Sequence, residues 1–488
     1  MVQELVTDRL LRSWLRCRRR AWLDRHGDPG QRLWTAHRAL ALSDQLGSFQ
    51  TLLPGRPGHG EAACAAGAVG VVGLRLYGIA PGGQGLQAHP ALLERVKGRS
   101  TWGDHAYWPV LGRQGRHLTR EHRLVLTLWG RLLAERQGAP VPLALAVAGE
   151  GRGLQRQRLA LGAGLQRQLD EAVGRLAGDL GRQEPPPLVA DRKKCVLCGW
   201  RGLCDQEARR QGHLSEVSGI GGRRRELLLE QGITSLGELA ACDPAALAAA
   251  LAVHGDQHRD IAADLVAQAR VQASGQPQRL RPAAAAGGPL PELVAAPGVL
   301  LYDIESDPDA RDDFLHGFVV VRRPAAGAWP GAAGPGAAAS CRYHPLLALQ
   351  EHGEARLWQR LRRYLAHYPG WPLLHYGETE AIALLRLARR QGADEAERDA
   401  LRVRLLDVHA RLRQHWRLPV NSYGLKAVAS WLGFRWTQSG VEGARCLLWW
   451  RQWRRDGGTP RLRRIFTYNR DDNLATWAVT RWLLDQER

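Results

Sequence analysis

Two carboxylates with the spacing of a metal site, Asp303 and Glu305, lie two residues apart in the run LLYDIESDP. The apolar residues around them predict a buried strand over 299–305, and the two-residue repeat of a strand places both carboxylates on one face. Burying two charged carboxylates at the end of a strand costs free energy unless a cation binds between them. Hard oxygen ligands of this kind suit Mg²⁺ or Mn²⁺. The alternative is an exposed strand end without a ligand.

A second acid position follows the strand predicted over 371–376. In HYGETEAIALL, Glu380 lies at the start of a helix, where its neighbour Glu378 can simply favour the helix N-terminus. Asp407, in LLDVHARL, is another candidate acid, but its helical spacing equally fits a solvated face.

A third position lies near the end of the sequence, where YNRDDNLATW places Tyr468 four residues before Asp472. We expect Asp472 on the first turn of a helix over 471–486. Residues four apart share one face of a helix that begins early enough, whereas Asp471 points about 100° away around the axis. A lone Tyr-x-x-x-Asp pattern is common, but its position after an Asp-x-Glu strand strengthens the prediction of a metal site.

A separate group of soft ligands has the pattern C-x2-C-x5-C. It consists of Cys195, Cys198 and Cys204. A fourth ligand from far upstream would complete a four-cysteine site, and Cys17 is the best placed. It falls on the apolar stripe of the first predicted helix with Leu10, Trp14 and Ala21. A buried structural cysteine is the alternative interpretation of Cys17.

Composition sets the class of protein. With 488 residues, the chain is long enough for about three domains of ~150 residues each. Lys+Arg 68 against Asp+Glu 48 gives a net charge of +20, which favours a polyanionic partner such as nucleic acid. No apolar run approaches the ~20 residues that span a bilayer, and Glu4 and Asp8 precede any apolar block. We therefore expect no membrane partner, no signal peptide and a cytoplasmic location.

The elements that must position these residues form a multidomain α/β chain. Its predicted segments are 1–208 with mixed helices and strands, 209–272 wholly helical, a Pro/Gly/Ala-rich linker over 273–297, and an α/β domain over 298–488. In the last segment we predict strands over 299–305, 315–321 and 371–376 and a hairpin loop over 322–340. The predicted helices there are 349–367, 378–391, 395–415, 425–432, 441–455 and 471–486.

The helical segment contains a glycine-rich turn, Gly219-Ile220-Gly221-Gly222, followed by three arginines. It resembles a helix-hairpin-helix, a motif whose turn N–H groups can meet a phosphate without side-chain obstruction. Arg223 and Arg224 would add positive charge at the turn. An ordinary helix connector is the alternative.

The Asp-x-Glu strand, HYGETE, SYGLKAV and YNRDD occur in that order over residues 298–488. Together they resemble the ribonuclease H-like, DnaQ-type 3′–5′ exonuclease superfamily, in its YprB-type branch. The resemblance implies a mixed sheet and two metal ions held by four acids. It assigns the bridging role to Asp303, single-metal roles to Glu305, Glu380 and Asp472, and water orientation to Tyr468.

Two further points concern this resemblance. Glu380 stands where better-known relatives carry Asp, a difference that the YprB-type branch allows. Lys426, in SYGLKAV, is a candidate contact to the nucleic-acid backbone, although a surface position would explain it equally.

One early cysteine with a late C-x2-C-x5-C resembles RecB-like nucleases that carry an iron–sulfur cluster. The resemblance covers about residues 1–270. It implies a PD-(D/E)XK-type fold and a [4Fe–4S] cluster on Cys17, Cys195, Cys198 and Cys204, with zinc as the alternative. Its nuclease signature looks lost, because the acid positions read Gln50, Ala91 and Leu111-Gly112-Arg113.

Three hypotheses of function follow. The leading one is a two-metal nuclease of the 3′–5′ exonuclease type, in which an inactive N-terminal domain and a helical module deliver the substrate. The second is a non-catalytic nucleic-acid-binding scaffold. The third is a nuclease that still uses the N-terminal domain through acids aligned differently, such as Glu61, Glu94 or Asp104. The sequence favours neither DNA nor RNA, and it indicates no particular protein partner.

Overall fold

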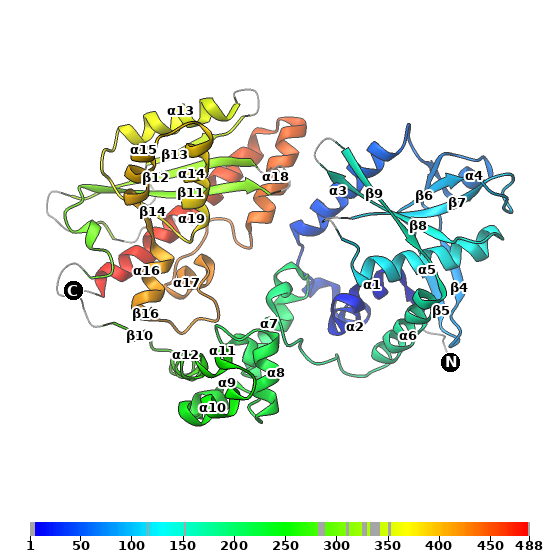
Figure 1. The fold of residues 1–488 in the computed structure, drawn as a ribbon, viewed down its shortest axis with the longest axis horizontal. Helices are drawn as coiled ribbons and strands as arrows, with labels where there is room; N and C mark the ends of the chain where they lie inside the picture. Colours follow the sequence, from blue (N-terminus) through cyan, green and yellow to red (C-terminus); the bar gives the residue numbers. More distant parts are fainter. Residues whose placement is uncertain are drawn as a thin grey trace. The chain divides into compact units, whose positions relative to one another are not determined.

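The protein is described by a computed structural model that covers residues 5–113, 115, 117–150, 153–281, 288–308, 312–324, 329–331, 342–349 and 353–486. The chain separates into two compact units, Met1–Glu207 and Ala208–Arg488 (Figure 1). In this described part of the chain, no helix combines the length and the apolar character needed to span a bilayer.

Unit 1 is built on a mixed six-stranded sheet with the order β2-β3-β6-β7-β8-β9. Its strands are β2 (Gly58–His59), β3 (Gly70–Val72), β6 (Leu92–Val96), β7 (Ala106–Gly112), β8 (Leu143–Glu150) and β9 (Gly153–Ala160). Strands β3, β6 and β7 are antiparallel, and helix α5 (Arg120–Gln137) leads from β7 to the parallel strand β8.

Alternation along the strands divides the core of this sheet into two layers. Leu92, Val110 and Leu145 face Phe49 and Leu52 of helix α3 (Ala36–Leu52). The adjacent residues of the same strands pack on the other side with α5; they are Leu93, Leu111 and Ala146. Each strand residue points opposite to the next, so the sheet is covered on both faces.

Smaller elements complete unit 1. A second sheet has the order β1-β5-β4 and consists of β1 (Leu5–Thr7), β5 (Gly85–Ala88) and β4 (Leu76–Ile79). The remaining helices are α1 (Asp8–Arg16), α2 (Arg18–His26), η1 (Pro29–Gln31), α4 (Gly60–Ala65), α6 (Ala163–Leu180), η2 (Lys193–Leu197) and α7 (Arg201–Arg210), the last of which extends into unit 2.

The prediction that one helix runs through Cys17 is wrong. Cys17 has an extended backbone (φ −165°, ψ 121°) and separates α1 from α2. Its N–H donates to the carbonyl of Ser13, while the Ser13 hydroxyl donates to Asp24 of α2 over 2.6 Å. This second bond holds α2 back against α1, so the apolar stripe stops at the turn.

The first part of unit 2, which lies within the segment predicted over 209–272, is helical. Its elements are η3 (Leu214–Glu216), α8 (Gly222–Glu230), α9 (Leu236–Ala241), α10 (Pro244–Ala252), α11 (Asp256–Arg259) and α12 (Ala262–Ser274), with a leucine-rich core of their own. The residues predicted as a linker also make defined contacts. Strand β10 (Gln278–Arg279) pairs with β16 (Trp416–Arg417), and Leu290 and Leu293 around η4 (Pro291–Leu293) are fully buried in the C-terminal core.

The C-terminal part of unit 2 contains a five-stranded sheet with the order β13-β12-β11-β14-β15. Its strands are β11 (Gly298–Asp307), β12 (Asp312–Arg322), β13 (Arg342–Leu347), β14 (Leu373–His375) and β15 (Leu405–Asp407). Strand β12 is antiparallel to both β11 and β13, whereas β14 and β15 continue the sheet parallel to β11. The sequence did not predict β13, and most of the loop predicted over 322–340 lies outside the described residues.

Helices cover both faces of this sheet (Figure 1). They are α13 (Gly353–Ala366), α14 (Thr379–Arg390), α15 (Glu395–Arg404), α16 (Val408–His415), α17 (Leu425–Trp431), α18 (Gly443–Asp456) and α19 (Thr459–Asp485). Leu300 and Phe318 pack toward α13 and α14, whereas Leu301 and Val319 pack toward α19. The sheet is thus the middle layer of three.

Two predicted helices are wrong in their bounds. The helix predicted over 395–415 is divided by β15, because Leu406 joins the core of the sheet and Asp407 accepts the N–H groups of His409 and Ala410 to begin α16. The final helix begins at Thr459 rather than at 471, with proline in its first turn. Asp472 therefore lies near the middle of a 27-residue helix and not on its first turn.

Candidate active site

Three carboxylates meet between β11 and α19. The alternation of β11 places Asp303 and Glu305 on one face, and α19 crosses that face with Asp472. One oxygen from each side chain lies within 4.8 Å of the others. Among the residues that the structure describes, they are the one group of three or more possible metal ligands at this spacing.

The electrostatics of this group are unfavourable without a cation. Burial, and then the charge of Asp472, raises the pKa of Asp303 and of Glu305 well above the usual range. Burial also raises the pKa of Asp472 to about 6, although the indole of Trp436 and the charge of Lys426 oppose the shift. Divalent cations relieve repulsion of this kind and prefer oxygen ligands. The donor set therefore fits Mg²⁺ or Mn²⁺.

Glu380 borders the three carboxylates from the first turn of α14. It is 7% exposed, and burial raises its pKa to about 7. Its Oε2 is buried and has no hydrogen-bond partner among the described residues. Its charge contributes to the raised pKa of Asp303, but it lies outside the 4.8 Å group. A buried carboxylate oxygen without a partner suits a cation ligand. Glu378, two residues earlier, is exposed.

Tyr468 lies one helical turn before Asp472 on α19 and hydrogen-bonds it. Burial raises the pKa of Tyr468 far above its usual value, so its hydroxyl stays protonated. Trp436 donates from Nε1 to Asp472 Oδ1 over 2.6 Å. The Nζ of Lys426 lies 4.9 Å from the centre of the Tyr468 ring and donates to the carbonyl of Val441. The surroundings of Asp472 therefore supply two donors and a positive charge.

Three acids close to these ligands have other partners. Asp407 accepts the N–H of Gly377 over 2.9 Å, which fixes the turn before Glu380. Asp307 continues the alternation of β11 after a bulge, and Arg451 of α18 pairs with both of its oxygens at 2.7 and 2.8 Å. Asp471 is only 1% exposed and accepts the N–H of Thr437.

Sequence reasoning missed Asn469, which lies in the same YNRDD motif. Its Nδ2 donates to Asp303 Oδ2 over 2.6 Å. A signal was present, because residues 469 and 472 are three apart and share one face of a helix. Trp436 was also missed, since nothing in its local sequence indicates a contact with Asp472.

In unit 1, the positions of the expected nuclease acids are filled by other residues. Gln50 lies near the end of α3, Ala91 precedes β6, and Leu111 is fully buried at the end of β7. Next to it, a Cβ on Gly112 would lie 2.4 Å from Cγ of Gln45, so this side chain covers the backbone. Arg113 is 5% exposed and bonds to Gln155.

The acids considered as an alternative catalytic set in unit 1 do not gather. Glu61 pairs with Arg136, and Asp104 is almost fully exposed beside Arg99. Glu94 lies half-buried on β6. Within the described residues of unit 1, no three acids, histidines or cysteines offer ligand atoms within 4.8 Å of one another.

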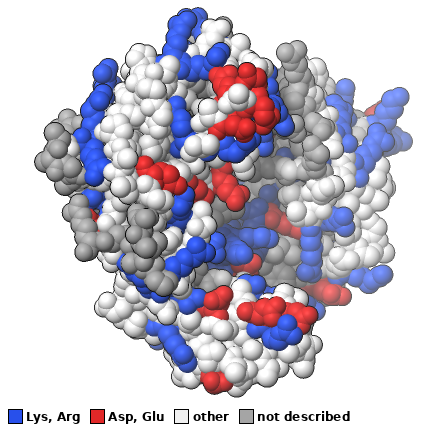
Figure 2. Space-filling model, turned by 60° about the vertical axis from the view of Figure 1, so that its left-hand side comes forward, with Lys and Arg blue, Asp and Glu red and all other residues white. Residues whose placement is uncertain are grey.

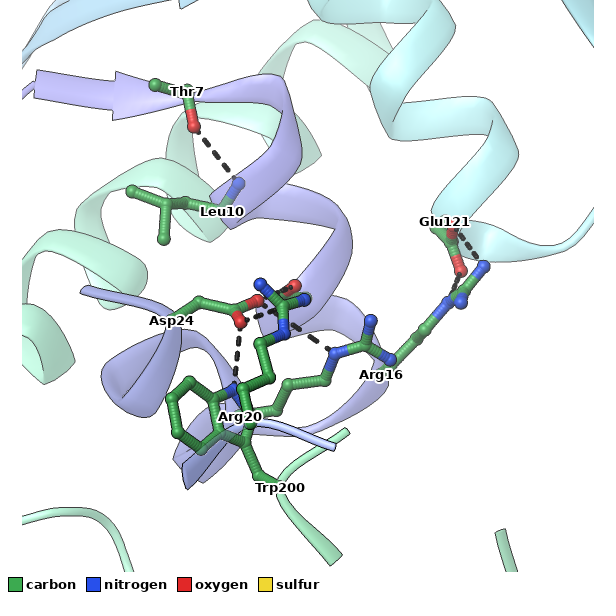
Figure 3. Close-up of polar contacts among 9 residues, drawn as sticks. Thr7, Leu10, Arg16, Arg20, Asp24, Glu121 and Trp200 are labelled. Atoms are coloured by element: carbon green, nitrogen blue, oxygen red, sulfur yellow. Dashed lines mark hydrogen bonds and ion pairs between the residues drawn. The ribbon is translucent and has the colours of Figure 1, made fainter. Parts of the chain in front are cut away.

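The four candidate cluster cysteines lie near each other in space. Cys195 lies in η2, Cys198 directly follows it, and Cys204 lies in α7. Each thiol interacts electrostatically with the turn residue Cys17 or with another thiol of the set. The turn and this segment are joined by Asp24, which accepts the indole N–H of Trp200 over 2.9 Å (Figure 3). No three of these thiols lie within 4.8 Å of each other.

The glycine turn of unit 2 has one backbone position that requires glycine. Gly219 has φ +92°, whereas Gly221 has an ordinary φ of −95° and open space around its missing Cβ. Arg224 donates to the carbonyl of Gly219 over 2.6 Å. Arg223 forms exposed ion pairs with Glu226 and Glu230. The turn is thus open at Gly221 and flanked by basic side chains.

Comparison with protein families finds a match in the C-terminal part of the chain. Residues 300–484 match the RNase H superfamily. A search of curated proteins finds no match for the chain. The matched range contains the three grouped carboxylates, Glu380 and Tyr468. The C-terminal part of the chain is therefore an RNase H-like domain, which suggests a nuclease-type function on nucleic acid and fits the use of Mg²⁺ or Mn²⁺ at this group.

Proposed function

We propose that this protein is a metal-dependent nuclease that removes nucleotides from the 3′ end of a nucleic-acid strand. The observation that carries the proposal is the group formed by Asp303, Glu305 and Asp472 within an RNase H-like domain. Phosphodiester hydrolysis needs charge stabilisation on both sides of the phosphorus, which clustered carboxylates provide by holding cations.

The residues have separable roles in this proposal. Asp303 would bridge two cations, while Glu305, Glu380 and Asp472 would each hold one. Two divalent cations, when bound, lower the pKa of a water molecule and stabilise the charge on the leaving oxygen. Trp436 donates to one oxygen of Asp472, and Tyr468 hydrogen-bonds the same carboxylate, so both side chains fix its orientation.

Tyr468 would orient the attacking water by accepting a hydrogen bond from it, while its own O–H donates to Asp472. Its hydroxyl stays protonated because burial and the neighbouring carboxylates raise its pKa, so it does not serve as the base. Lys426 is held beside Tyr468 and Val441. Its positive charge would stabilise the strand backbone next to the site.

The alternative of a non-catalytic scaffold is less well supported, because it leaves the cost of burying these acids without a benefit. The charge of the chain supports nucleic acid as the partner in either case. Basic side chains are spread over the face shown in Figure 2, with smaller acidic groups between them. The open turn at Gly219 and Gly221, with Arg223 and Arg224, would contact the phosphates of the strand.

A panel of end-labelled strands tests the proposal. The purified full-length protein is incubated with single- and double-stranded DNA and RNA in Mg²⁺, Mn²⁺ or EDTA. We expect a 5′-labelled strand to shorten stepwise and a 3′-labelled strand to release labelled mononucleotide, in both cases with a divalent cation and not in EDTA. Cleavage that begins inside the strand would contradict the exonuclease assignment, and binding without cleavage would favour the scaffold.

For unit 1 we propose a RecB-like fold that no longer cuts and that carries a [4Fe–4S] cluster on the four cysteines. The proposal is motivated by the pattern C-x2-C-x5-C together with the upstream Cys17, and zinc is the alternative metal for the same thiols.

The metal content of the protein tests this assignment. Protein purified without oxygen should be brown and contain iron and acid-labile sulfide, and Cys198→Ala should bleach it. Cys242, a half-buried cysteine in the helical part of unit 2, provides the control, since Cys242→Ala should keep the colour. A colourless wild-type protein with stoichiometric zinc would contradict the cluster.

A further inference from the structure

Asn469 connects α19 to the Asp-x-Glu strand. It is fully buried, and its Nδ2 donates to Asp303 Oδ2 over 2.6 Å. The same side chain also hydrogen-bonds Glu305. One amide therefore contacts both carboxylates of β11, although it cannot act as a cation ligand through its nitrogen.

The orientation of this amide is fixed by Tyr343 of β13. As a cation ligand Asp303 would be ionised, and an ionised carboxylate only accepts hydrogen bonds, so the NH₂ group of Asn469 must face it. Its Oδ1 then faces the Tyr343 hydroxyl, which donates to it over 2.9 Å. The hydroxyl thus prevents the amide from flipping its oxygen toward the carboxylates.

Room for the amide is provided by Gly317, the residue of β12 directly opposite Asp303. A Cβ at this position would lie 1.6 Å from Asn469 Oδ1. The backbone of Gly317 does not adopt a positive φ. Any residue would be acceptable to the backbone there, so the close approach of Asn469 is what requires glycine.

We infer that Asn469 is a positioning residue that orients Asp303 and Glu305 for a divalent cation, with Tyr343 and Gly317 holding its amide in place. The inference rests on the metal-dependent nuclease proposed above. Groups that hydrogen-bond a metal ligand from behind fix its direction, and their loss typically weakens metal affinity about 10–100-fold. A merely structural asparagine would affect folding and leave the affinity for the cation unchanged.

Calorimetric titration of the full-length protein with Mn²⁺, without nucleic acid, tests this role. We expect Asn469→Ala and Gly317→Ala to weaken Mn²⁺ binding at least ~10-fold, because one removes the amide and the other displaces it. Tyr343→Phe, which removes only the orienting hydroxyl, should weaken binding by a smaller factor. The first two changes should also lower kcat more than they raise KM for the strand, since Asn469 is placed behind the ligands and not against the substrate.

Asn473 provides a matched control. It is equally buried one turn further along α19, and its Nδ2 donates to the carbonyl of Asn469. Asn473→Ala should lower the melting temperature yet leave Mn²⁺ affinity within about twofold of wild type.

The outcomes separate the two proposals. Wild-type affinity for Mn²⁺ in Asn469→Ala would overturn the positioning role while the nuclease proposal stands. Failure of the wild-type protein to bind any divalent cation would overturn the nuclease proposal itself. If Asn469→Ala does not fold, Tyr343→Phe becomes the deciding variant, because it keeps nearly the whole tyrosine side chain. Unchanged Mn²⁺ affinity in Tyr343→Phe would then overturn the positioning role of Asn469.

Discussion

The six-stranded sheet of unit 1 and the five-stranded sheet of unit 2 are each covered by helices on both faces, yet they differ where their strands end. In unit 2, one carboxylate oxygen from each of Asp303, Glu305 and Asp472 lies within 4.8 Å of the others. In unit 1, the end of β7 is closed by Leu111 and by Gln45 packed on Gly112. Both sheets pack on apolar layers of helix and strand residues. Packing therefore does not explain why three carboxylates meet in unit 2.

The difference also shows that burying these acids lowers the stability of the metal-free fold. Each carboxylate of the unit 2 group has its pKa raised by burial, which means that the folded state disfavours its charge. Acids at such positions persist when a bound cation offsets the repulsion. At a buried position without a cation, an apolar side chain such as that of Leu111 is the more stable choice.

The largest expected effect is on catalysis at the unit 2 group. Asp303→Asn removes the charge that both cations would share, and loss of a metal-held transition-state interaction should lower the rate at least ~10³-fold. Glu305→Gln and Asp472→Asn should be nearly as severe. The measurement is single-turnover digestion of a labelled strand.

Asp399→Asn is the control for these variants, because Asp399 is exposed and pairs with Arg402 of its own helix. Asp471 is unsuitable despite its position beside Asp472, since its buried carboxylate holds the backbone at Thr437. If Asp303→Asn digested the strand at the wild-type rate, the carboxylates of unit 2 would not be needed for cleavage. The proposed functional difference between the two sheets would then be wrong.

A smaller effect is expected when the water-orienting group is changed. Tyr468→Phe removes a hydroxyl that hydrogen-bonds Asp472 but leaves every carboxylate in place. We expect Mn²⁺ binding to be retained and the rate to fall ~10²-fold, as is typical for a group that positions a proton or a water. A variant that loses Mn²⁺ binding along with activity would show that Tyr468 supports the ligands and does not orient water.

The repulsion within the unit 2 group should appear in the stability of the metal-free protein. Because the folded pKa of Asp472 is about 6 and that of Glu380 about 7, the folded state retains protons that the unfolded chain releases near pH 4. In EDTA, the free energy of unfolding should therefore fall as the pH rises from about 4 to about 7. Each carboxyl contributes ~1.4 kcal/mol to this fall for every pH unit between its unfolded and its folded pKa.

Excess Mn²⁺ should flatten this profile, and Glu380→Gln should remove part of the slope in EDTA. Glu378→Gln is the matched control, since Glu378 is exposed two residues away. A metal-free profile that is flat between pH 4 and pH 7 would contradict the account of the acids as mutually repulsive.

The smallest effect is predicted for the acids of unit 1. Glu94→Ala and Asp104→Ala should leave nuclease activity within a small factor of wild type, because neither belongs to a group of possible metal ligands. Digestion by the full-length protein is again the readout. A collapse of activity in either variant with an unchanged melting curve would mean that unit 1 also cuts.

The sequence could predict the elements whose signals are local. Strand β11 was recognisable because Val299–Tyr302 is an unbroken apolar run, and α14 because its apolar residues follow the helical repeat. The start of α19 was missed because RLRR, before Ile465, hides the repeat among charges. Strand β15 was missed because three residues between two helices carry too short a pattern.

The contacts around the site depend on residues distant in the sequence, and local patterns could not provide them. The role of Asn469 requires Tyr343 from β13 and Gly317 from β12, which meet it only in the folded sheet. Cys17 was expected to face inward on a continuous helix. The bond between Ser13 and Asp24 that turns the chain at Cys17 joins two helices, and single-helix periodicity contains no information about it.

The close approach of Gly317 and Asn469 has a consequence for how this part of the chain can change during evolution. A side chain at position 317 would need the space that the Asn469 amide now fills, and a smaller residue at position 469 would leave that space free. Neither exchange is acceptable alone in an active protein, whereas both together become possible once the cation is no longer used. The two positions should therefore vary as a pair among relatives, and a relative that has lost both Gly317 and Asn469 should be one that has also lost Asp303.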